Sequence, residues 1–400
     1  MAGQDLAPSP RAPGARRARR WSWNDPTTRA IIYQVGLLLL VGLLIWYLAH
    51  NTLRNLAARN ITTGFDFLQQ QAGFSIGESA IDYSPTDSYG RAVLVGLLNT
   101  LMVSVVGIIA ATVLGTLLGI GRLARNSLVS GLCSIYIEVM RNIPLLLQLY
   151  FWYALVTEVM PSARKAFSPL PSVFISNRGL RLPWLQGNAM EWMLGGLAVA
   201  IAACLLLGHW SRRRQEASGR SFALLPACAA LLLALPALGW WISGAGFVVD
   251  RPVLKGFNFQ GGFTVTPEMF ALLAGLVTYT AAYIAEVVRS GIQAVNKGQW
   301  EAAASIGLSR ARVLRFVILP QTMRVVIPPM TSQYLNLVKN SSLAVAIGYP
   351  DIVAVTNTIL NQTGQAIEGI AIIMAAYLVV SLSISLFMNW YNKRMALVER

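Results

Sequence analysis

Long runs of apolar residues dominate this chain, and they recur at intervals with short polar stretches between them. A hydrocarbon core of about 30 Å requires about 20 helical residues, because each residue of an α-helix rises about 1.5 Å. Eight runs reach this length, and each predicts a membrane-spanning helix. Their approximate limits are residues 30–50, 92–120, 133–157, 191–209, 222–243, 268–288, 326–347 and 367–391.

The seventh run is more polar than the others. It contains Asn336, Lys339, Asn340, Ser341 and Ser342. Polar and charged side chains are costly in hydrocarbon and are retained where they face protein or water. We therefore expect this span to lie against other parts of the protein or against a water-filled path.

Composition agrees with a membrane chain, since 55% of the residues are hydrophobic, 12% are charged and the mean hydropathy is +0.54. The fold class predicted is an all-α integral membrane protein. If both termini lie on the cytoplasmic side, the inner segments hold 21 Lys and Arg residues against nine in the outer segments, with Arg141 and Lys339 inside spans. Flanking cations are retained in the cytoplasm, so this topology is the one predicted. The net charge of +15 therefore sorts by loop and does not indicate a nucleic-acid partner.

The Arg-rich start before the first apolar run invites comparison with a secretory or twin-arginine signal. The apolar stretch from Ile31 to Ala49 is longer than a cleavable core, and no small-x-small site closes it before His50. We interpret residues 1–29 as a basic cytoplasmic tail that can touch membrane lipid, residues 30–50 as an uncleaved first span, and residues 51–91 as a periplasmic segment.

Several chemistries find no support in the sequence. No GxxxxGK[ST] phosphate loop is present, so the chain is not expected to hydrolyse ATP, and no paired carboxylates or nucleophile constellation favours an enzyme. The three cysteines, Cys133, Cys204 and Cys228, lack CxxC spacing, which favours packing roles. The two histidines have no nearby carboxylate. We expect this chain to bind no metal and no cofactor.

One polar segment between spans has a distinctive local pattern, EAAASIGLSRARVLRFVILP at residues 301–320. Residues 301–306 are mostly helix formers, Gly307 can take the left-handed conformation that ends a helix, and Ser309 can cap the next one. The pattern predicts a helix, a tight turn and a second helix.

The second helix is predicted to be amphipathic. One side would carry Val313, Phe316, Val317 and Pro320, with Arg312 and Arg315 on another. The alanines before the turn would let a partner backbone approach closely, and Pro320 would mark the exit toward the following span. Such a helix fits across a groove of another protein.

At these residues the chain resembles the inner-membrane permeases of ATP-binding-cassette (ABC) importers, whose cytoplasmic loop reads EAA, three residues, Gly, nine residues, Ile, one residue, Leu-Pro. The matching residues are Glu301, Ala302, Ala303, Gly307, Leu319 and Pro320, and Val317 stands where the family usually has Ile. This resemblance identifies residues 289–325 as the loop that couples the permease to its ATPase.

Further motifs resemble the polar amino acid importers within that family. They are residues 97–101 (LLNTL), 141–149 (RNIPLLLQL), 279–289 (YTAAYIAEVVR) and 333–343 (QYLNLVKNSSL). The resemblance implies a type I permease domain over residues 92–391, with a five-helix core, a helix pair inserted near 191–243 and a cytoplasmic tail at 392–400. With the first span and the inserted pair as three additional helices, the layout is similar to the longer permease of general L-amino acid importers.

The resemblance also implies partners and a mechanism. The partners are a dimer of ABC ATPase subunits that uses the ATP, a periplasmic amino-acid-binding protein and a second permease subunit, for which a heterodimer is favoured over a homodimer. The location implied is the bacterial inner membrane. The mechanism is alternating access, in which the helical hairpin transmits the ATPase motion to the spans.

Two sets of site residues follow from the resemblance and from the polar positions within spans. The coupling set is Glu301, Ala302, Ala303, Gly307 and Pro320. The candidate translocation path is Glu138, Arg141, Gln148, Asn336, Lys339, Asn340 and Ser341.

Alternatives stay open for several of these residues. Glu301 is either a contact to the ATPase or an exposed helix carboxylate. Glu138 and Arg141, one turn apart, either line the path or pair with each other. The polar residues of the third and seventh spans either bind an amino acid or tie helices together.

An ion-coupled secondary transporter or a channel without an ATPase partner is the competing class. It would explain the spans and the polar positions within them. It would require ion-coupling residues or inverted repeats, neither of which is evident, and it leaves the helical hairpin without a role.

Overall fold

The computed structural model describes residues 26–58, 64–185, 189–219, 222–244 and 249–395. Most of the predicted basic tail at 1–29 and the last five residues of the predicted tail at 392–400 lie outside the described residues. The chain divides into two compact units, Met1–Gly64 and Phe65–Arg400. Each unit is described by itself.

The described part of the first unit is mainly one helix, α1 (Pro26–Ala58), which contains the predicted first span. Most of its large apolar side chains from Ile31 to Leu48 are exposed within this unit. A helix that is apolar on all sides is suited to lipid.

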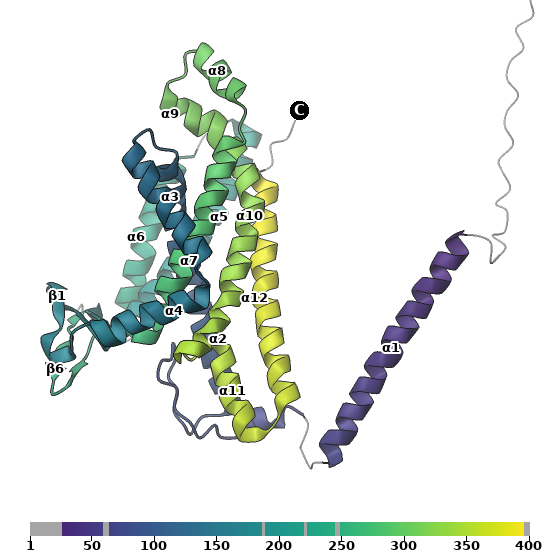
Figure 1. Ribbon diagram of the computed structural model, residues 1–400. Coiled ribbons are helices and arrows are strands. Elements are labelled where there is room, and N and C mark those ends of the chain that lie inside the picture. Colours follow the sequence, from purple (N-terminus) through teal and green to yellow (C-terminus); the bar gives the residue numbers. More distant parts are fainter. Residues whose placement is uncertain (1–25, 59–63, 186–188, 220–221, 245–248, 396–400) are drawn as a thin grey trace, which may run out of the picture. The chain divides into compact units, whose positions relative to one another are not determined.

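Four long helices form the centre of the second unit: α2 (Tyr89–Arg122), α7 (Pro267–Gln293), α10 (Leu319–Asn340) and α12 (Ala366–Met395). Helices α2 and α7 pack directly together, and α7 also packs against α10 (Figure 1). Close approach is possible because Gly115 and Gly119 of α2 face the backbone oxygens of Ala281 and Ala285. Small residues at such crossings are typical of helices packed within a membrane.

The predicted third span is broken rather than continuous. Helix α3 (Ser127–Asn142) is followed by α4 (Leu145–Ala154) and a π-helical turn (Leu155–Val159), and the two parts meet at an angle of 105°. Pro144 lies at the break, where it has no N–H to donate. The prediction of one helix over 133–157 was therefore wrong in its geometry, although apolar residues occupy both arms.

The inserted pair forms α5 (Ala189–Ser218) and α6 (Leu224–Ile242), which pack against each other. Short strands, which the sequence did not predict, flank this pair: β1 (Phe167–Leu170), β2 (Val173–Ser176), β3 (Gly179–Leu182), β4 (Trp184–Leu185), β5 (Val249–Asp250), β6 (Val253–Lys255), β7 (Asn258–Gln260) and β8 (Phe263–Val265). An antiparallel sheet has the order β1-β2-β3-β8, and β4 pairs with β5 and β6 with β7. Strands before and after the pair therefore meet, so the chain returns to the end of the bundle from which it left.

The two ends of the second unit carry different elements (Figure 1). We call the end with the strands and α11 (Ile352–Thr363) the sheet end. Three short helical segments also lie at this end: η1 (Asp66–Gln69), η3 (Ala163–Lys165) and the 3₁₀ segment η5 (Ser341–Ile347), which follows α10. The opposite end, with α8 (Lys297–Ser305) and α9 (Arg310–Val313), is the hairpin end. Successive long helices alternate in direction between these ends.

Among the described residues, seven helices are long and apolar enough to cross a membrane, and counting the bent α3–α4 pair as one span brings the number to eight. The strands are few and short, so the chain is dominated by helices. The predicted fold class, an all-α integral membrane protein with about eight spans, is confirmed.

Candidate functional site

The hairpin at residues 297–313 has the predicted helix–turn–helix form. Helix α8 begins after Asn296, whose side chain accepts a hydrogen bond from the backbone N–H of Gly298 (2.8 Å). The helix ends at Ser305, and two residues later Gly307 has φ +78° and donates its N–H to the carbonyl of Ala304 (2.9 Å). A left-handed residue at this position turns the chain so that the last carbonyls of the helix are satisfied. The turn therefore depends on glycine.

Ser309 occupies the N-cap position of α9 with an extended backbone, as the sequence predicts. Its hydroxyl makes no capping hydrogen bond, so the predicted side-chain cap was wrong. The left-handed backbone of Gly307 accounts for the turn, and the Ser309 side chain contributes no hydrogen bond to it.

The buried side of the second helix differs from the prediction. Val313 and Ile318 are buried in a small cluster with Val295 and Ala303, whereas the Phe316 side chain is 64% exposed. The reason is a π-helical turn, η4 (Leu314–Ile318), directly after α9. A π-helical turn holds one residue more than an α-helical turn, so residues five apart, such as Val313 and Ile318, face the same side of the helix here.

No loop separates the hairpin from the following span. Helical backbone continues from Arg310 through η4 into α10, and Pro320 lies in the first turn of α10. The backbone before it is already helical, and Pro320 has no N–H to donate to the carbonyls of the preceding π-helical turn. Pro320 therefore marks the start of the span inside a continuous helix, and any displacement of α9 acts on α10 directly.

The five predicted coupling residues occupy different environments. Glu301 and Ala302 are exposed, Ala303 is buried in the hairpin cluster, Gly307 is exposed and Pro320 is partly buried. Two apolar side chains, Ile306 (76% exposed) and Phe316, stand uncovered beside them. Ile306 lies outside the candidate spans, whereas Phe316 lies in the first part of the candidate span Arg310–Ile347. A large apolar residue that is exposed outside a span is characteristic of an interface with another protein.

A charged network lies at the hairpin end of the bundle. Glu286 of α7 accepts a hydrogen bond from Arg122 of α2 (2.6 Å) and is paired with Arg289 one turn along α7. Arg122 also lies 3.8 Å from Glu138 of α3. Side chains of Arg122, Glu286 and Arg289 are each about one quarter exposed. These ion pairs connect α2, α3 and α7 where the helices approach the hairpin.

The residues of the predicted path do not form one cluster. Glu138 pairs with Arg122, while the guanidinium of Arg141 lies 5.2 Å from the centre of the Tyr283 ring, so no ion pair between Glu138 and Arg141 occurs among the described residues. Gln148 is buried and donates to the carbonyls of Met140 (2.9 Å) and Ile143 (3.1 Å). Gln148 therefore satisfies backbone groups at the break between α3 and α4 and holds the bend.

The polar residues of the seventh span separate by exposure. Asn336 and Lys339 are exposed and lie one turn apart on α10, and Asn340 is partly exposed. Ser341 is buried, and its hydroxyl donates to the carbonyl of Val338 (2.7 Å). Asn336 and Lys339 can thus meet a partner or a permeant molecule, whereas Ser341 supports the helix end.

The sequence did not single out the Glu286 network as a site, although Glu286 and Arg289 lie in one of the motifs that carry the family resemblance. The presence of a carboxylate and an arginine within or next to a predicted span could have indicated this site, because charged residues are rare in such segments. Among the described residues, no group of three or more His, Cys, Asp or Glu is placed so that it could hold a metal ion.

Comparisons with known proteins agree with this geometry. Residues 104–397 match the family model described as "binding-protein-dependent transport system inner membrane component". The general L-amino acid transport system permease protein AapQ of Rhizobium johnstonii is 48% identical over 95% of this chain and 96% of its own length. The putative amino-acid ABC transporter permease protein YhdX of Escherichia coli is 50% identical over 95% and 97%. The glutamate/glutamine/aspartate/asparagine transport system permease protein BztB of Rhodobacter capsulatus is 41% identical over 94% and 96%.

Proposed function

This chain belongs to the family of binding-protein-dependent transport system inner membrane components, and we propose that it is the permease subunit of an ATP-driven, binding-protein-dependent importer of amino acids. All three relatives named above are permease proteins of amino acid transport systems, and each matches nearly the whole chain. The single observation that carries the coupling mechanism is the hairpin at 297–313, with its left-handed turn at Gly307 and the exposed apolar side chain of Ile306.

This role assigns a separate task to each subunit of the importer. The chain supplies the translocation path and the hairpin that contacts the ATPase, and separate ABC ATPase subunits hydrolyse ATP. A periplasmic binding protein delivers the amino acid, and a second permease completes the path. Resemblance to the longer permease of general L-amino acid systems favours a heterodimer. No cofactor is assigned to this chain. A secondary transporter or channel is not favoured, since the family depends on binding proteins.

The orientation proposed places the hairpin end in the cytoplasm of a bacterium and the sheet end in the periplasm, with both termini cytoplasmic. In support, the basic residues Arg122, Arg125, Lys297, Arg310 and Arg312 all lie in the segments at the hairpin end. Cations flanking spans are retained on the cytoplasmic side. The segment 51–91 and the strands would then face the periplasm.

Coupling would proceed through direct contacts. An ATPase surface would cover Ile306, Phe316 and Ala302, with Glu301 available to a basic or polar group of that subunit. Movement of α8 would reach α10 because Gln321 donates to Gln299 (3.2 Å) and because the helix is continuous. It would reach α7 through the contact of Gly291 with Val326. These contacts give two routes from the hairpin into the spans.

For the path, the geometry supports a shorter set than the sequence did. Asn336 and Lys339, exposed on α10, and Arg141 on α3 are the charged or polar groups that a second permease or a permeant amino acid can reach. Asn340 lies beside them. Glu138, Gln148 and Ser341 have partners within the chain, which favours supporting roles.

The test uses two matched phenylalanines. Phe316 at the hairpin end and Phe257 at the sheet end are both largely exposed (64% and 71%), and each has an arginine over its ring. Phe316→Glu should abolish co-purification of the ATPase subunits after mild solubilisation, whereas Phe257→Glu should retain it. Capture of ATPase by both variants at the wild-type level would refute the proposed docking surface, and no ATPase with the wild-type chain would refute the importer function.

A further inference from the structure

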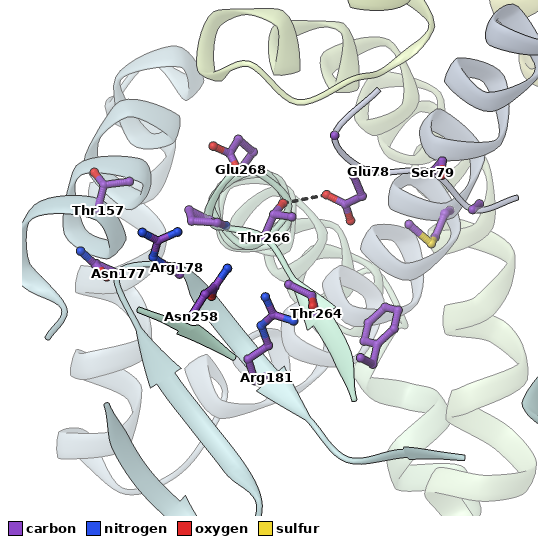
Figure 2. Close-up of a pocket in the computed structure, with 15 residues that line it drawn as sticks. Glu78, Ser79, Thr157, Asn177, Arg178, Arg181, Asn258, Thr264, Thr266 and Glu268 are labelled. Carbon is purple, nitrogen blue, oxygen red and sulfur yellow. Dashed lines mark hydrogen bonds between the residues drawn. The ribbon is translucent and has the colours of Figure 1, made fainter. Parts of the chain in front are cut away.

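A second site lies at the sheet end, far from the hairpin. A cavity of about 730 Å³ opens between the loop that contains Glu78, the start of α7 and the turn between β2 and β3 (Figure 2). Ligand pockets for small molecules commonly measure about 300–1,000 Å³. The cavity is therefore large enough for a free amino acid with a side chain of any size.

One wall of the cavity carries two carboxylates. The hydroxyl of Thr266 donates to Glu78 (2.7 Å), and the hydroxyl of Tyr153 donates to Glu268 (3.2 Å). Burial raises the pKa of Glu78, the hydrogen bond from Thr266 lowers it, and the charge of Glu268 raises it. No cationic side chain is paired with either carboxylate within the described residues. A bound cation at this wall would relieve the repulsion between the two groups.

The opposite wall carries two guanidinium groups. Arg178 is exposed in the turn after β2, and Arg181 is partly buried on β3; both side chains point into the space shown in Figure 2. The buried Nε of Arg181 and the buried Oδ1 of neighbouring Asn177 have no hydrogen-bond partner. Burial and then the charge of Arg178 lower the pKa of Arg181. An anion here would supply the acceptor that Arg181 lacks.

The charges of the two walls sum to zero, with carboxylates on one side and guanidinium groups on the other. A ligand that fits must offer an anionic and a cationic group at once and must add no net charge. A dicarboxylate would leave Glu78 and Glu268 without a cationic partner, and a diamine would leave Arg178 and Arg181 without an anionic partner. A zwitterion satisfies both walls.

We propose that this cavity binds a free amino acid as its zwitterion, with the α-carboxylate on Arg178 and Arg181 and the α-ammonium on Glu78 and Glu268. The inference rests on the proposed import function, which it deepens by placing an amino acid subsite at the outer mouth of the permease. The side chain would occupy the remaining volume near Asn258 and Thr157. Recognition of the backbone charges alone suits a site that accepts many amino acids.

The site also gives the additional segment a role. Arg178 and Arg181 belong to strands and turns that precede the inserted helix pair, and β8, which pairs with β3 at Leu182 and Phe263, follows it. The sheet that positions both guanidinium groups therefore closes only because the chain returns after α6.

The experiment measures binding of radiolabelled L-glutamine to the purified full-length chain in lipid nanodiscs, without ATPase or binding protein. We expect saturable binding that Arg178→Gln, Arg181→Gln and Glu78→Gln each weaken about tenfold or more, the range lost with one charge-assisted hydrogen bond. Arg178 is exposed, so its variant keeps the fold even if Arg181→Gln does not. The matched control is Arg164→Gln, an arginine at the same end that lies over Phe257 outside the cavity and should leave the affinity unchanged.

Two analogues separate the walls. Glutaramic acid lacks the α-ammonium and 4-aminobutanamide lacks the α-carboxylate, and each should compete at least about tenfold more weakly than L-glutamine. Absence of saturable binding by the wild-type chain, or equal affinities for the wild type, Arg178→Gln and Glu78→Gln, would overturn the proposal. A third outcome would also overturn it: if no preparation binds L-glutamine but Arg178→Gln no longer captures the binding protein, the cavity is a contact surface for that protein. Capture of the ATPase by the same preparations tests the import function separately.

Discussion

The left-handed backbone of Gly307 predicts a defined cost for any side chain at the hairpin turn. A Cβ at this position would meet nothing within 4 Å, so the cost is conformational and owes nothing to packing. The left-handed conformation costs an L-residue about 1–2 kcal/mol, and asparagine tolerates it best. A cost of about 1–2 kcal/mol changes the equilibrium between the native turn and other turns about 5–30-fold. We therefore expect Gly307→Val to lower ATP-dependent uptake by a factor of this order, with Gly307→Asn close to wild type.

A matched glycine separates loss of coupling from general strain. Gly364 ends α11 with φ +73°, and a Cβ there would also meet nothing within 4 Å, but this glycine lies at the sheet end. Gly364→Val should thus carry a similar strain. The assay is uptake by proteoliposomes that contain the complete transporter, together with ATP hydrolysis in the same vesicles. Equal uptake losses in Gly307→Val and Gly364→Val, or wild-type uptake in Gly307→Val, would refute the role of the turn in coupling.

Three further predictions concern the bundle. Glu286→Gln should lower the free energy of unfolding by about 1–3 kcal/mol, because it leaves Arg122 and Arg289 without the carboxylate that lies between them. In thermal unfolding, adding Arg122→Gln to this variant should restore part of the lost stability. Additive losses of stability in the double variant would contradict the pairing. Gly115→Ala should destabilise by about 1–3 kcal/mol, since a Cβ there lies 2.7 Å from Ile284, whereas Gly131→Ala, with open space, should not lower the unfolding midpoint. Burial raises the pKa of Asp351 to about 7, so the protonated carboxyl contributes its full stabilisation below about pH 4, and this contribution is lost as the pH rises through 7. Asp351→Asn keeps the helix cap and should flatten the dependence of the unfolding midpoint on pH. Identical pH profiles of the wild type and the variant would contradict this assignment.

Much of the architecture was predictable because the bilayer imposes length. Apolar windows placed seven of the eight spans close to their observed helices, since a helix that crosses lipid must satisfy its own backbone over about 20 residues. The third span was apolar throughout, and periodicity alone does not tell a straight helix from two arms joined at Pro144. The strands escaped prediction because each has two to four residues, too few for an alternating pattern to emerge.

The site was predictable where local backbone chemistry decides it. Gly307 and the turn followed from the sequence, whereas the burial of Ile318 in place of Phe316 depends on a π-helical turn that no residue type requires. Polar residues within spans could be found but not assigned. Whether Gln148 lines a path or holds a bend depends on the carbonyls that the break at Pro144 leaves beside it.

Helix α7 connects the two candidate sites physically. Its first turn supplies Glu268 to the cavity, and its last turns carry Glu286, which pairs with Arg122 of α2, and Gly291, which lies against Val326 of α10. A helix of 27 residues is about 40 Å long and is stiff along its axis. Because Gly115 and Gly119 let α2 pack closely on its middle, the two helices resist separating but can slide or tilt as a pair. A displacement of α10 by the ATPase would therefore reach the cavity through α7. Because Thr266 alone separates β8 from α7, and β8 pairs with β3, Glu268 and the sheet that carries Arg181 are expected to move together, so the hairpin would move the two walls as a unit.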